Sequence, residues 1–120
     1  MRGLTLILLT ADRERFAGAL ATAAAHCAIG ARVRLFCQDR AVALLATNGD
    51  LPLDADRDRA GLPRLREMLD EALALGVEVQ ACQSGLALSG IAADALDPRI
   101  ETGGLIGLLA TLGDDRLVTV

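Results

Sequence analysis

The chain has 120 residues, 16 acidic and 12 basic side chains, a net charge of −4, and no tryptophan or tyrosine. An acidic protein with so few aromatic side chains lacks the charge and the stacking surfaces that nucleic-acid binding requires, and an anionic membrane would repel it. All basic residues are arginines, which excludes lysine Schiff-base chemistry and a Walker-type phosphate loop.

The length fits a single domain over residues 1–120 that can bury a core without disulfide bonds. No apolar run approaches the roughly 18 residues that span a bilayer, and charges at residues 12–15 interrupt the first apolar run too early for a secretory signal. Three cysteines without metal-binding spacing favour a reducing compartment, so we expect a cytoplasmic protein with no metal and no cofactor. A hydrophobic content of 52% favours a homo-oligomer.

Strand and helix patterns alternate in the first part of the chain. Residues 4–9 form an apolar run without a helical stripe, which predicts a strand buried on both faces. Asp12 suits the N-cap of a helix that stops near Gly30. Residues 31–37 alternate polar and apolar side chains, so we expect a second strand that is less completely covered than the first.

Within the first helical pattern, Cys27 falls on the stripe that faces the core, and His26 lies beside that stripe. His26 is the only histidine in the chain. A surface or interface role for it is favoured over that of a general base, because the middle of a helix rarely faces a reaction site.

The central part of the chain predicts two helices, a loop and a third strand. Residues 39–46 are expected to be helical, residues 48–50 to form a turn, and the charged run at residues 54–59 to lie in a solvated loop. Pro63 opens a long helix through Leu75, with Gly76 as its C-cap. Residues 77–81 form the third strand.

The last part of the chain predicts one helical turn at residues 92–96, a helix at residues 105–112 and a strand at residues 117–120. The last helix is apolar nearly all round, so it lies in the core or under a partner subunit. The whole pattern predicts an α/β fold with three layers: a mainly parallel sheet of four to five strands, with flavodoxin-like topology and helices on both faces.

Cys82 follows the third strand directly, where a segment rich in glycine and serine begins. In a parallel sheet the carboxyl ends of the strands open onto a crevice, and the amides that begin the next helix favour a thiolate. Cys82 is therefore the candidate catalytic residue. The alternative is a small buried hydrophobe that closes a strand, which describes most free cysteines.

Polar groups follow Cys82 closely in the sequence. Gly85 allows close approach of the backbone to a ligand, and Gln83, Ser84 and Ser89 are candidates to hydrogen-bond a sulfur anion. The alternatives are a helix cap for Ser84, a turn residue for Ser89 and a solvent-exposed side chain for Gln83.

Arg13, near the start of the first helix, is expected at the same edge of the sheet and is a candidate to attract an anionic ligand. Its neighbours Asp12 and Glu14 offset its charge, so a solvated surface is the alternative.

The sequence Ala81-Cys82-Gln83, with Gly90-Ile91 beginning eight residues after the cysteine and an apolar helix and a strand to follow, resembles the DsrE/DsrF-like family of small sulfur-relay proteins. The resemblance implies a three-layer α/β protein that forms trimers or hexamers and in which Cys82 carries sulfur as a persulfide. Two departures concern the branches of the family. Gly85-Leu86 stands where one branch has a Ser-Met pair, and Ser89 stands where another has arginine.

We therefore expect a sulfur-transfer protein that uses Cys82, with sulfur donor and acceptor proteins as partners. The alternative is a non-catalytic oligomeric module of the same fold that binds a small anion or a protein. A thiol peroxidase is a third hypothesis, although no arginine and no resolving cysteine lie near Cys82 in the sequence.

The roles of Cys27 and Cys37 stay open at this point. A disulfide between Cys37 and Cys82 is not favoured, because with the first strand between theirs the two cysteines would lie about 9.6 Å apart.

Overall fold

The structure of the protein is a computed structural model that describes residues 1–46 and 52–120, so the predicted turn at residues 48–50 lies outside the described part. Five parallel strands form one sheet in the order β4-β3-β2-β1-β5. The strands are β1 (Leu4–Leu8), β2 (Val33–Cys37), β3 (Glu78–Cys82), β4 (Glu101–Gly103) and β5 (Arg116–Thr119).

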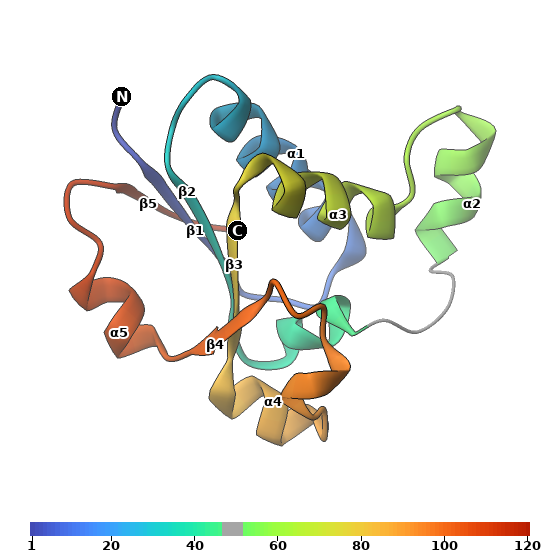
Figure 1. Cartoon of the computed structure of the whole chain (residues 1–120). Helices are drawn as coiled ribbons and strands as arrows, with labels where there is room; N and C mark the ends of the chain where they lie inside the picture. The colour runs from blue at the N-terminus through green and yellow to red at the C-terminus, as the bar shows by residue number, and fades with distance from the viewer. Residues whose placement is uncertain (47–51) are drawn as a thin grey trace.

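Helices cover both faces of this sheet, which confirms the predicted three-layer α/β fold. The helices of the described residues are α1 (Arg13–Ala28), α2 (Pro52–Arg59), α3 (Leu65–Leu75), α4 (Gln83–Ser89) and α5 (Leu105–Ala110), with the 3-10 turns η1 (Asp39–Leu45) and η2 (Ala93–Ala95). Helices α1 and α3 pack together on one side of the strands, and α5 lies on the other (Figure 1). The strand order differs from the 2-1-3-4-5 order of flavodoxin. The predicted flavodoxin-like topology is therefore confirmed only for the three layers and the parallel strands.

The strand register assigns side chains to the two faces, because neighbouring residues on paired strands point the same way. One face is aliphatic and comprises Leu4, Leu6, Leu8, Val33, Leu35 and Val79, all of which are buried. The other face carries two rows, Thr5, Arg34 and Glu78 in the first and Ile7, Phe36 and Gln80 in the second. Because side chains alternate along β3, Cys82 lies on the same, more polar face as Glu78 and Gln80.

Two predicted helix ends are confirmed by their local geometry. The side chain of Asp12 caps α1 by accepting a hydrogen bond from the backbone nitrogen of Arg15 at 2.9 Å. Gly76 ends α3 in the left-handed conformation at a φ of 105°, which glycine adopts without strain. α3 itself begins at Leu65, two residues after the expected Pro63, with Arg64 as its N-cap.

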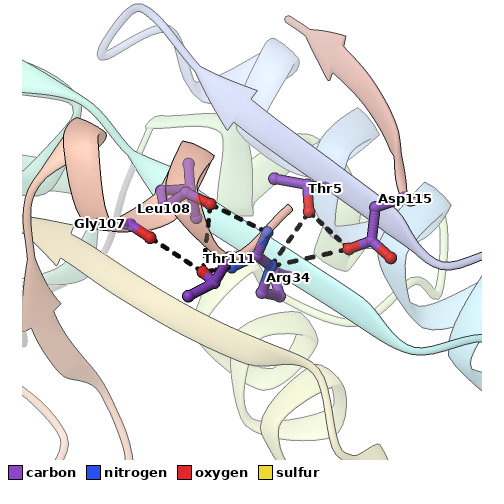
Figure 2. A network of polar contacts seen from close by, with 6 residues as sticks. All are labelled: Thr5, Arg34, Gly107, Leu108, Thr111 and Asp115. Atoms are coloured by element: carbon purple, nitrogen blue, oxygen red, sulfur yellow. Dashed lines mark hydrogen bonds and ion pairs between the residues drawn. The ribbon is translucent and has the colours of Figure 1, made fainter. Parts of the chain in front are cut away.

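The expectation that the second strand is partly uncovered was wrong, because all five residues of β2 are buried. Arg34 is only 2% exposed, and its guanidinium donates to the Thr5 hydroxyl, the Thr111 hydroxyl and the Leu108 carbonyl oxygen at 3.1, 2.8 and 3.2 Å. The Nε atom of Arg34 also lies 3.7 Å from the Asp115 carboxylate, which accepts a bond from Thr5 (Figure 2). These partners satisfy a charge that could not otherwise be buried.

The charged run at residues 54–59 forms α2, so the prediction of a solvated loop was wrong there. Asp54 is 5% exposed and accepts a hydrogen bond from the backbone nitrogen of Leu65 at 3.1 Å. An aspartate that accepts a bond from the first amide of α3 ties the two helices together, and this contact between distant residues is invisible to a local charge pattern.

The last helix is not sandwiched in the core of the chain. Leu108 is its only buried residue, whereas Ile106 is 87% exposed. All four residues of the edge strand β5 are exposed as well. The strand β4, which was not predicted, is only three residues long. Within residues 1–46 and 52–120, no helix is both long enough and apolar enough to cross a membrane.

Candidate functional site

Cys82 is both the last residue of β3 and the N-cap of α4, so the predicted position at a strand-to-helix turn is confirmed. Its backbone is extended, with φ of −64° and ψ of 124°, and its side chain makes no capping hydrogen bond. The residue is 7% exposed. The thiol is therefore held near the carboxyl edge of the sheet without being tied to the helix that it begins.

The other two cysteines are in different surroundings. Cys37 is fully buried, and this burial raises the pKa of its thiol to about 12, which keeps it protonated at neutral pH. The Cys27 thiol donates to the carbonyl oxygen of Leu75 at 3.1 Å. Cys82 thus differs from Cys37 in keeping some exposure, and from Cys27 in lying at the carboxyl ends of the strands.

The expectation that the first strand lies between the strands of Cys37 and Cys82 was wrong. The strand β2 pairs directly with β3, so β1 does not lie between the two cysteines. Cys37 is in register with Ala81, and because side chains alternate along a strand, Cys82 points to the opposite face of the sheet. All three cysteines are free.

A backbone contact holds the turn that carries Cys82. A β carbon on Gly85 would overlap the carbonyl oxygen of Asp39 and lie 2.7 Å from its carbonyl carbon, so only glycine fits there. Asp39 has a positive φ of 48°, a conformation that non-glycine residues seldom adopt. Gly85 therefore serves the packing of α4 against η1, which follows the neighbouring strand β2.

The polar candidates after Cys82 are distributed along α4. Gln83 and Ser84 are exposed in its first turn, whereas Ser89 is half-buried at its last residue, before Gly90 ends the helix at a φ of 64°. At ~1.5 Å per residue, Ser89 lies roughly 10 Å along the axis from Cys82. This separation removes Ser89 from the groups that can bond the sulfur directly.

Arg13 is exposed at the start of α1, after the carboxyl end of β1. The strand β2 lies between β1 and β3, and α1 packs against β1, β2 and α3, while α4 packs against β3 and η1. The structure therefore brings η1, rather than the start of α1, to the Cys82 turn. Arg40 lies in the first turn of η1, which packs against α4, and sequence reasoning missed it because η1 was not placed beside the third strand.

Sequence reasoning also missed the residue opposite Cys82 on β4. The two Cα partners are Cys82 and Gly103, and a β carbon on Gly103 would lie 3.1 Å from the Oε1 atom of Gln80. The absence of a side chain at Gly103 thus leaves room for Gln80 on the face that Cys82 shares. The only signal was the sequence Thr102-Gly103-Gly104, which was interpreted as the approach to a helix.

Among the described residues, no group of three or more histidine, cysteine, aspartate or glutamate side chains is arranged to hold a metal ion. The chemistry that this arrangement offers is that of a single thiol at the end of an interior strand, next to the first amides of a short helix. Such a thiol can act as a nucleophile when it ionises.

These features define a small three-layer α/β protein with a cysteine at the carboxyl edge of a parallel sheet. The fold is similar to that of the YchN protein from E. coli, which has a DsrE-like fold, with a TM-score of 0.79 and 24% identity over 100% of both chains. A protein of unknown function from Methanobacterium thermoautotrophicum, MTH1491, gives a TM-score of 0.74 at 14% identity, again over 100% of both chains. BT1422, a conserved protein of unknown function from Bacteroides thetaiotaomicron, gives a TM-score of 0.67 at 19% identity over 97% of this chain and 93% of its own.

No protein-family model matches the chain, and no curated protein matches it in sequence. The similarities to solved structures show the fold.

Proposed function

We propose that this protein is a sulfur carrier in which Cys82 holds sulfur as a persulfide between a donor and an acceptor protein. The observation that carries the proposal is the difference between two buried, strand-ending cysteines: the residue Cys82 keeps 7% exposure, whereas Cys37 on the adjacent strand keeps none. The resemblance of Ala81-Cys82-Gln83 and Gly90-Ile91 to the DsrE/DsrF-like pattern and the similarity to the fold of YchN support the same function.

The transfer needs two exchange steps. The Cys82 thiolate attacks the outer sulfur of a donor persulfide, the donor's S–S bond breaks, a new S–S bond forms on Cys82, and the donor leaves as a thiolate that takes up a proton. An acceptor thiolate then attacks the outer sulfur on Cys82 in the same way and releases the Cys82 thiolate. No net oxidation occurs, so the cycle requires no cofactor.

The start of α4 supplies the groups that favour the anion. The amides of residues 83–85 have no partners within the helix and carry partial positive charge, which stabilises a thiolate or persulfide anion at the N-cap. Gln83 and Ser84 are exposed in the same turn and are the side chains we propose to contact the bound sulfur or its donor. Arg13 and Arg40 lie at the same edge of the sheet and contribute longer-range attraction for an anionic donor.

We also propose that the working form is a homo-oligomer, a trimer or hexamer, in the cytoplasm, where a reducing environment keeps the thiols free. The exposed apolar residues of the last helix and strand supply the interface: Leu105, Ile106, Leu109, Leu117 and Val118. α5 covers the face of the sheet to which Cys82 belongs, so a partner packed on α5 would border the thiol. Assembly and site are thus expected to be adjacent.

Mass spectrometry after incubation with a persulfide donor tests this function. The protein is expected to gain one sulfur atom on Cys82, the gain is expected to disappear in Cys82→Ser, and the matched control Cys27→Ser is expected to keep it. A wild-type protein that gains no sulfur would contradict the carrier role and leave the non-catalytic binding module. Sulfur retained by Cys82→Ser would assign the chemistry to another cysteine.

A further inference from the structure

A pocket lies at the amino ends of the strands, on the edge of the sheet opposite to Cys82. It has a volume of about 270 Å³, its polar lining includes Arg2, His26 and Arg116, and its apolar lining includes Met1, Leu4 and Ile29. No aspartate or glutamate is among the residues that line it. In a chain with a net charge of −4, this pocket is a local concentration of cationic and hydrogen-bonding groups.

Hydrogen bonds to backbone oxygens place the guanidinium of Arg2 and the backbone of Arg116 at this pocket. The Nε atom of Arg2 donates to the carbonyl oxygen of Asp114 at 2.9 Å, which fixes the guanidinium without neutralising it. Arg116 is in register with Leu4, and its backbone nitrogen donates to the Gly3 carbonyl oxygen at 2.9 Å, which places the residue on the pocket wall. The nearby carboxylate of Asp115 is already engaged by Thr5 and Arg34 on the other side of the strand.

His26 adds a directional group. Its Nδ1 atom lies 3.0 Å from the carbonyl oxygen of Thr22, and because a carbonyl only accepts, Nδ1 carries the hydrogen. This bond fixes the ring and leaves Nε2 as the atom that can meet a ligand. The expected surface or interface role of His26 thus becomes more specific.

We propose that this pocket binds a small oxyanion, the sulfate or phosphate type of group, through Arg2, Arg116 and His26. Guanidinium groups match tetrahedral oxyanions in geometry and charge, and two arginines line this pocket with no carboxylate among its lining residues. The volume is just below the range of roughly 300–1,000 Å³ for drug-sized ligands, so the ligand is small. Leu4 and Ile29 offer an apolar wall to a short carbon chain attached to the anion. The site is independent of the Cys82 chemistry.

The ring of His26 is the direct reporter, because it is the only histidine in the chain. Sodium sulfate is titrated into the full-length protein while the imidazole resonances are followed by NMR, with sodium chloride at matched ionic strength as the comparison. We expect a saturable shift with sulfate that chloride does not reproduce. An identical response to both salts would overturn the proposal.

The variant Arg2→Gln/Arg116→Gln is expected to weaken sulfate binding at least tenfold. The control Arg15→Gln/Arg59→Gln, which removes the same charge from exposed positions outside the pocket, is expected to leave sulfate binding unchanged. Far-UV circular dichroism of both variants establishes that they fold. If the first variant does not fold, His26→Gln gives the same test, with the sulfate-dependent rise of its melting temperature compared with that of the Arg15→Gln/Arg59→Gln protein. Equal affinity in the pocket variant and the control would contradict the proposed site.

Binding measurements with inorganic phosphate and propyl phosphate distinguish a free oxyanion from an organic phosphate ester as the ligand. Tighter binding of the ester supports an organic phosphate that uses Leu4 and Ile29, and equal binding supports the free ion. Failure of sulfate and both phosphates to bind would overturn the proposal.

Discussion

The carbonyl group of Asp39 occupies the space that a side chain on Gly85 would need, and these two residues set how closely α4 packs against η1. Cys82 is the N-cap of the same helix, three residues earlier. The position of the candidate reactive thiol therefore depends on a contact between two turns that follow adjacent strands.

Gly85→Ala is expected to destabilise the protein by about 1–3 kcal/mol, because the added methyl group meets backbone atoms that cannot move independently. The same change should alter the rate at which a small reagent modifies Cys82. Urea unfolding and alkylation kinetics measure the two effects. Gly18→Ala is the control, since nothing lies within 4 Å of the added group in the middle of α1, and it is expected to stabilise by roughly 0.5–1 kcal/mol. Equal effects of both substitutions would show that the Asp39 contact is unimportant.

Arg34→Met is expected to cost about 3–5 kcal/mol of unfolding free energy, because it leaves the buried carboxylate of Asp115 without its cation. The double variant Arg34→Met/Asp115→Asn should lose less unfolding free energy than the sum of the losses of the two single variants, since it removes both charges. Chemical denaturation measures both values. The exposed neighbour Arg32→Met is the control and should change stability by no more than about 0.5 kcal/mol. Additive losses in the double variant would contradict the coupled network.

Hydrogen bonds from the Arg99 side chain and backbone lower the pKa of the Asp97 carboxyl to about 2. Its ordinary value is about 3.9, so the pKa is depressed on folding, and the contribution to stability is present above about pH 4 and is lost as the pH falls toward 2. Carboxyl ¹³C NMR should show Asp97 titrating near pH 2. In Arg99→Gln the midpoint should rise toward the ordinary value; an unchanged midpoint would exclude Arg99 as the cause.

Ile106→Asp is expected to convert the assembled protein to a smaller species, because Ile106 is 87% exposed, more than any other large apolar residue of α5. Light scattering after size-exclusion chromatography measures the change. Leu62→Asp places the same charge at a separate exposed leucine, outside α5 and β5, and should keep the wild-type mass. A monomeric wild-type protein, or equal loss of mass in both variants, would exclude α5 as the interface.

Local patterns predicted the elements whose stabilising contacts are themselves local. The apolar run of β1, the Asp12 cap of α1 and the Gly76 end of α3 all have signals within a few residues, and each was found where expected. The position of Cys82 at a strand end followed from the same kind of signal.

Contacts between distant residues explain the errors. Arg34 looks like a solvent-facing strand residue until Thr111 and Asp115, far away in the sequence, supply its partners. Asp54 looks solvated until the first amide of α3 meets it, and the order of β2 and β3 cannot be deduced from strand patterns alone. The candidate site was therefore predicted as Cys82, residues that follow it closely in the sequence, and Arg13. Its neighbours from other elements, Asp39, Gln80 and Gly103, required the fold.

The accessibility of the Cys82 sulfur tests the central claim most directly. The folded protein is treated with iodoacetamide at neutral pH, and peptide mass spectrometry measures the rate of modification at each cysteine. The account predicts that Cys82 is modified while the fully buried Cys37 is not, and that both react once the protein is unfolded. A Cys82 as unreactive as Cys37 in the folded protein would contradict the sulfur-carrier proposal.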